Sequence, residues 1–83
     1  MQSAHLREFL SRHMKRRKIR NWSHFAEEIG STPQLVHKWT RGAVTISRSA
    51  EGRIIEALNL SAGAERELGR LIRAVDAERR DEE

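Results

Sequence analysis

Apolar residues recur at helical spacing in five short segments of this chain. Near the amino terminus, for example, Leu6, Leu10 and Met14 fall on one face of a helix. Residues three and four apart share a helix face, whereas a half-buried strand needs apolar and polar residues in alternation. No stretch of the chain alternates in that way. The pattern therefore predicts an all-α fold of five short helices around one core.

Residues that favour helix ends separate these segments. A candidate amino-terminal cap stands at the start of each segment: Ser3, Asn21, Thr32, Ser47 and Ser61. Pro33, the only proline, suits the first position of the third helix because that position needs no N–H donor. Gly30 and Gly42 can end the second and third helices, since glycine adopts the left-handed conformation at low cost. We expect the first helix to span about residues 3–16.

The length of 83 residues leaves room for one small domain, which we place at residues 1–75. Residues 76–83 are charged apart from Ala77, and we expect this tail to fray. The fifth helix carries an apolar stripe formed by four residues: Leu68, Leu71, Ile72 and Val75. This stripe is our candidate for a dimer contact, with closure of the core within one chain as the alternative.

Several classes of protein are disfavoured by the residue types present. The chain has no cysteine, which excludes disulfides and thiolate sites, and its four histidines lack the spacing of metal ligands. It has no glycine-rich phosphate loop and no nucleophile elbow. No apolar run approaches the roughly 20 residues of a membrane span, and the amino terminus lacks the pattern of a secretory signal. We expect a cytoplasmic protein that is not an enzyme and needs no metal or other cofactor.

Charge is distributed unevenly along the chain. Residues 1–42 include nine basic and three acidic side chains, whereas residues 43–83 include seven basic and nine acidic ones. The first half therefore carries a net charge of +6 and the second half −2. A basic half favours a polyanion such as nucleic acid as the partner.

Residues 21–42 contain two helices joined by a short turn at Gly30, a residue that permits a sharp reversal. Val36 and Trp39 can bury one side of the second of these helices. Its other side is polar and carries Gln34, His37, Lys38 and Arg41. Such side chains can reach base edges in the major groove of DNA, which is about 12 Å wide.

The stretch from His24 to Gly42 resembles the helix-turn-helix family of phage repressors and Cro proteins. The resemblance rests on Ala26, Gly30, the Thr32–Pro33 cap, Val36, Trp39 and Gly42, and it extends into the fourth helix through residues 53–58. In all it covers about residues 6–60. It implies a five-helix fold of the lambda-repressor type, with the third helix as the recognition helix. It also implies a bacterial or phage-infected cell as the setting.

The resemblance further implies roles for single positions. Base contacts are expected from Thr32, Gln34, His37 and Lys38. Phosphate contacts are expected from Asn21, Trp22, Thr40 and Arg41, and the basic run just before the second helix adds Arg17 and Lys18. Pro33 stands where many members carry a polar base reader, so base recognition is expected to shift to the polar residues that follow it. Trp22 is bulkier than usual at its position, and packing over the second helix is the favoured alternative for it.

The expected function is sequence-specific binding of double-stranded DNA by a transcriptional regulator. A repressor or Cro-like switch of this kind would bind a two-fold operator as a homodimer. The alternative is an antitoxin or a protein-interaction adaptor. In that case the acidic half or the fifth helix would bind a protein partner, such as a toxin, and DNA binding would be autoregulatory.

Overall fold

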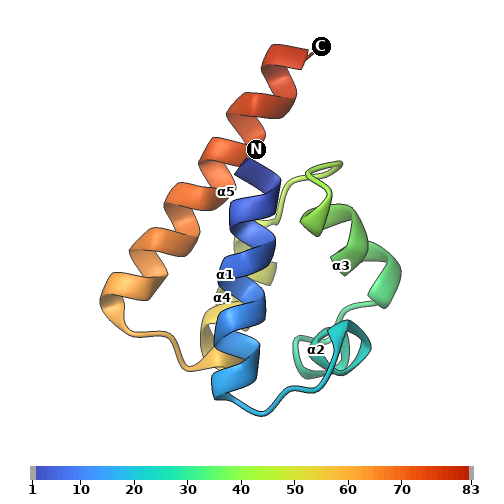
Figure 1. The fold of residues 1–83 in the computed structure, drawn as a ribbon, viewed down its shortest axis with the longest axis vertical. Helices are drawn as coiled ribbons and strands as arrows, with labels where there is room; N and C mark the ends of the chain where they lie inside the picture. Colours follow the sequence, from blue (N-terminus) through green and yellow to red (C-terminus); the bar gives the residue numbers. More distant parts are fainter. Residues whose placement is uncertain (1, 83) are drawn as a thin grey trace.

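A computed structural model describes residues 2–82 of the chain. Its helices, in chain order, are α1 (Gln2–Arg16), α2 (Trp22–Glu28), α3 (Pro33–Thr40), α4 (Arg48–Leu58) and α5 (Ala62–Glu82) (Figure 1). No strand occurs within these described residues. The prediction of an all-α fold with five helices is confirmed.

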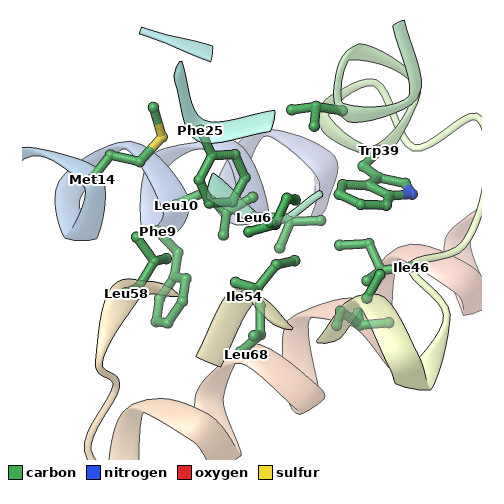
Figure 2. Packing of buried hydrophobic residues seen from close by; sticks show 14 of the residues in the cluster. Leu6, Phe9, Leu10, Met14, Phe25, Trp39, Ile46, Ile54, Leu58 and Leu68 are labelled. Atoms are coloured by element: carbon green, nitrogen blue, oxygen red, sulfur yellow. The ribbon is translucent and has the colours of Figure 1, made fainter. Parts of the chain in front are cut away.

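α1 runs through the middle of the molecule, between α5 on one side and α3 on the other (Figure 1), and it packs against both. α2 packs against α3. Apolar side chains from all five helices meet in one core (Figure 2), among them Leu6, Phe9, Leu10, Met14, Phe25, Trp39, Ile54, Leu58 and Leu68. Full burial of such a side chain contributes about 1.5–3 kcal/mol, so this shared core is what holds the short helices together.

The predicted helix caps are confirmed at four of the five positions. The side-chain oxygens of Asn21, Thr32, Ser47 and Ser61 each accept a hydrogen bond from the backbone N–H three residues ahead, at 2.8–3.2 Å. The prediction for Ser3 is wrong, because α1 already begins at Gln2. Gly30 and Gly42 have φ angles of 66° and 74°, as expected for residues that end α2 and α3.

Two core residues lie outside the predicted helical segments. Ile19, in the connection from α1 to α2, is buried, and its N–H donates to the carbonyl oxygen of Met14 at 2.9 Å. Ile46, just before α4, is buried as well. Helical spacing does not reveal either residue, since each lies in an irregular connection. Leu35, by contrast, is an apolar residue of α3 that stays 38% exposed and lies outside the core.

The apolar stripe of α5 is part of the core of the single chain. Its four residues, Leu68, Leu71, Ile72 and Val75, are between 0% and 7% exposed. They are covered by the chain's own helices, chiefly because α5 packs along α1. The assignment of this stripe to a dimer contact is therefore corrected. Packing within one chain leaves little of its apolar surface exposed to a second copy.

The tail was expected to fray from residue 76, and this prediction is wrong for its described part. α5 continues without a break to Glu82. Polar contacts hold this part of the helix against the rest of the chain: Glu78 Oε2 accepts from the backbone N–H of Gln2 at 3.0 Å, and Arg79 donates to the carbonyl oxygen of Gly42 at 3.2 Å. A charged composition gave no sign of these partners, because they are distant in sequence.

Candidate nucleic-acid interface

α3 has one buried side and one bare side. Val36 and Trp39 face the core, with exposed fractions of 0% and 2%. The four residues predicted to contact bases, Thr32, Gln34, His37 and Lys38, are all exposed. The chain itself therefore leaves the outward side of α3 uncovered and available to a partner.

Local bonding fixes both ends of this helix. Thr32 Oγ1 accepts from the N–H of Leu35 at 3.2 Å, and Pro33 occupies the first turn. At the other end, Thr40 Oγ1 donates to the carbonyl oxygen of His37 at 2.9 Å, and Arg41 follows as the carboxyl-terminal cap. The hydroxyl hydrogen of Thr40 is thus already used, whereas the Arg41 side chain is exposed.

The connection from α1 to α2 presents Arg17 and Lys18 to solvent. Lys18 has a φ of 59°, the left-handed conformation that ends a helix. Because the next residue, Ile19, is anchored in the core, the two basic side chains stand on a fixed turn rather than on a free loop.

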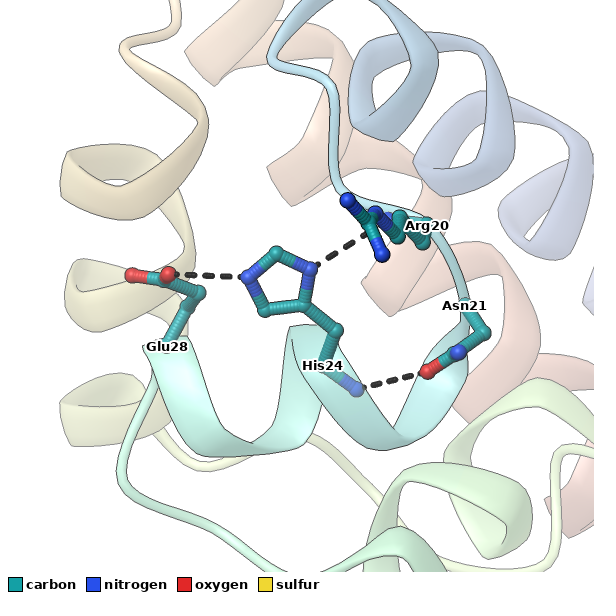
Figure 3. A network of polar contacts seen from close by, with 4 residues as sticks. All are labelled: Arg20, Asn21, His24 and Glu28. Atoms are coloured by element: carbon teal, nitrogen blue, oxygen red, sulfur yellow. Dashed lines mark hydrogen bonds and ion pairs between the residues drawn. The ribbon is translucent and has the colours of Figure 1, made fainter.

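The start of α2 is held by a small polar network (Figure 3). Asn21 Oδ1 accepts from the backbone N–H of His24 at 2.8 Å. The His24 ring contacts the backbone N–H of Arg20 through Nδ1 at 3.3 Å and the Glu28 carboxylate through Nε2 at 3.1 Å. The tautomer with its proton on Nε2 satisfies both contacts. Sequence reasoning missed this role of His24, although its spacing of four residues from Glu28 is typical of helix side-chain pairs.

Trp22 is half-buried, as the packing alternative predicts. Its ring and the Phe25 ring form a T-shaped pair, with centroids 6.0 Å apart and planes at 81°. The indole also lines the boundary between α1 and α3, where a shallow hollow lies beside it. Trp22 therefore supports this surface mainly by packing.

That hollow is lined mostly by basic and polar side chains. Its two adjoining parts share Arg7, Trp22 and Thr40; one part adds Arg12 and Lys15 from α1, and the other adds His37 and Arg41 at the end of α3. Glu8 is the one carboxylate among the described residues that line it. Sequence reasoning missed the contribution of α1. The spacing of Arg7, Ser11 and Lys15, four residues apart on one helix face, is the signal that could have revealed it.

His13 does not add to this positive charge at neutral pH. Its ring packs against Phe9, with centroids 4.5 Å apart. Burial lowers the pKa of His13, and the neighbouring Arg16 and Arg12 lower it further. The neutral form is therefore favoured, and the permanent positive charges of α1 are those of Arg7, Arg12, Lys15 and Arg16.

The described residues show neither a cluster of three or more side chains suited to a metal ion nor a helix long and apolar enough to cross a membrane. What they bring together is a bare polar helix side, a basic turn and a basic hollow on neighbouring elements. No protein-family model matches the chain, and neither the curated proteins nor the solved structures include a significant match to it.

Proposed function

We propose that the chain is a sequence-specific regulator that binds double-stranded DNA, with α2 and α3 acting as a helix-turn-helix of the phage-repressor and Cro type. The observation that carries the proposal is the division of α3 into a buried apolar side and an exposed polar side. A helix with a bare polar side fits the major groove, where base edges present hydrogen-bonding groups.

Base recognition is assigned to the outward residues of α3. Gln34 is suited to a bidentate contact with adenine, and Lys38 to the acceptor atoms of guanine. Thr32 stands at the amino-terminal end of the helix and His37 one turn further along. Pro33 has no amide or carboxylate to offer to a base, so Gln34 is the first side chain of the helix that can read sequence.

Phosphate binding is assigned to groups on both flanks of α3. Arg17 and Lys18 lie in the turn before α2, Asn21 caps α2, and Arg41 follows α3. Thr40 and Trp22 line the basic hollow and add polar and aromatic surface to it. Contacts of this kind orient a protein on the duplex without reading sequence.

We further propose that the protein acts as a homodimer on a two-fold operator. One small module buries only about 600–1,000 Å² of protein surface on DNA, which limits the affinity of a single copy. A two-fold pair places its recognition helices about 34 Å apart, one turn of the duplex. The buried stripe of α5 does not provide the contact, so the pairing surface lies among exposed residues.

Selection of bound duplexes from a random DNA pool, at stated salt, tests the proposal. The expected result is an enriched palindrome whose half-sites are centred about 34 Å apart. A pool that shows no enriched sequence after repeated rounds would exclude sequence-specific recognition. If all duplexes are retained equally, the protein binds DNA through charge alone and does not recognise sequence.

Substitutions at Gln34 and Arg17 are expected to have different effects. Gln34→Ala should relax the base preference at one operator position and cost about 1–3 kcal/mol of binding free energy on the preferred sequence. Arg17→Ala should weaken binding to all duplexes alike and flatten the slope of log affinity against log salt by about one. Titrations of the preferred and a random duplex at several salt concentrations measure both quantities. If both variants lose affinity equally on the two duplexes, the separate roles are wrong.

A substitution in the basic hollow tests whether α1 contributes to DNA binding. Arg7→Ala should also flatten the salt slope by about one, because each neutralised phosphate contributes about −0.9 to it. Arg66→Ala, at an exposed position on α5, is the control that removes the same charge away from the hollow. Equal slopes for the two variants would remove α1 from the interface.

A further inference from the structure

The loop that follows α3 is tied at both ends to one turn of α5. At its start, Arg79 Nη1 donates to the carbonyl oxygen of Gly42 at 3.2 Å. At its end, Thr45 Oγ1 donates to Asp76 Oδ2 at 2.7 Å. Arg79 Nη2 and Asp76 Oδ1 close the set with an ion pair at 2.9 Å. Residues 42 and 45 are thereby linked through the ion-paired side chains of Arg79 and Asp76.

The backbone of the loop is constrained at the same place. Gly42 has a φ of 74°, and a Cβ there would lie 3.2 Å from both Ser3 Cβ and Val75 Cγ1. The N–H of Ala43 donates to the carbonyl oxygen of Lys38 at 2.9 Å, which ties the loop to the last turn of α3. The loop therefore sits between α3 and α5 and is bonded to both.

The two α5 side chains are suited to holding a loop. Asp76 and Arg79 are each 26% exposed, so their ion pair is partly shielded from water. Charge-assisted hydrogen bonds are stronger than neutral ones, and paired networks lose several contacts when one member is removed. Within this pair the positive charge of Arg79 balances the negative charge of Asp76.

We propose that Asp76 and Arg79 are positioning residues for the DNA interface: the carboxyl-terminal turns of α5 hold residues 42–45 in one orientation relative to α3. This inference rests on the proposed function. In this proposal the last turns of α5 do not contact DNA themselves but hold other residues of the interface in place. Loss of the contacts should loosen the loop and, with it, the Arg41 end of the recognition helix.

Two substitutions test the inference. Thr45→Val removes a hydroxyl without changing charge, and Arg79→Met removes the guanidinium but keeps an extended apolar side chain. Each should raise the hydrogen-exchange rate of the Gly42 and Ala43 amides about fivefold, because a charge-assisted contact that holds their loop against α5 is lost. Each should also lower affinity for the duplex enriched from the random pool about fivefold, while circular dichroism shows unchanged helix content.

Arg80→Met is the matched control, because it removes the same charge from the exposed neighbouring position. It should leave both amide exchange rates unchanged. If Thr45→Val and Arg79→Met exchange like the control, α5 does not hold the loop and the inference is overturned. Faster exchange with unchanged DNA affinity overturns the positioning role. If the unmodified protein binds no DNA, the proposed function fails first, and exchange in the free protein still reports whether the loop is held.

Discussion

Leu68→Asp is expected to abolish cooperative folding of the chain. Leu68, on α5, is fully buried in the shared core, where it lies near Ile54 of α4 (Figure 2). Removing a buried leucine side chain costs about 2–5 kcal/mol, and an unpaired buried carboxylate adds several more. At about 0.05–0.15 kcal/mol per residue, the whole domain has a stability comparable to this loss. Circular dichroism and thermal melting should show loss of helix and of a cooperative transition.

Gly63→Asp is the control for this variant. It introduces the same negative charge on the same helix, at an exposed position with nothing within 4 Å of the new Cβ. It should melt as the unmodified protein does or slightly higher, because a carboxylate near a helix amino terminus is favourable by about 0.3–1 kcal/mol. Sedimentation adds a second readout. If the unmodified protein is a dimer and Leu68→Asp is a folded monomer, the α5 stripe forms the dimer contact after all.

The chain's periodicity and capping residues were enough to predict that five helices form and where four of them begin. Asn21, Thr32 and Ser47 act on backbone groups three residues away, so their effect is local and readable. The outward side of α3 could be predicted for the same reason, since the burial of Val36 and Trp39 follows from spacing within one helix.

What the sequence did not predict depends on partners distant in the chain. Ile46 is buried although it lies in the irregular connection between α3 and α4, and no periodic pattern marks such a residue. The tail of α5 looked free because nothing in its charged residues points to the loop more than thirty positions earlier, where Asp76 meets Thr45. The stripe of α5 fits a dimer contact and a core equally well by pattern, and only the packing of α5 on α1 decides between them.

Lys38→Glu is expected to remove specific DNA binding while leaving the fold intact. Lys38 is exposed on the outward side of α3, so its replacement disturbs no core contact. In the proposed complex, one good base contact would be worth about 1–3 kcal/mol, and the new carboxylate would also be repelled by the phosphates. Affinity for the preferred duplex should therefore fall by about 100-fold, as measured by fluorescence anisotropy at fixed salt.

Arg66→Glu separates this effect from a change in net charge. It makes the same charge reversal at an exposed position on α5, which lies across α1 from α3 (Figure 1). Its affinity should fall only a few-fold, since exposed charges farther apart than about 10 Å are largely screened at 0.1 M salt. Thermal melting of both variants checks the fold, because a glutamate in the last turn of α3 opposes the helix dipole by about 0.3–1 kcal/mol. Equal losses for Lys38→Glu and Arg66→Glu would mean that overall charge alone attracts DNA and that α3 is not a recognition helix.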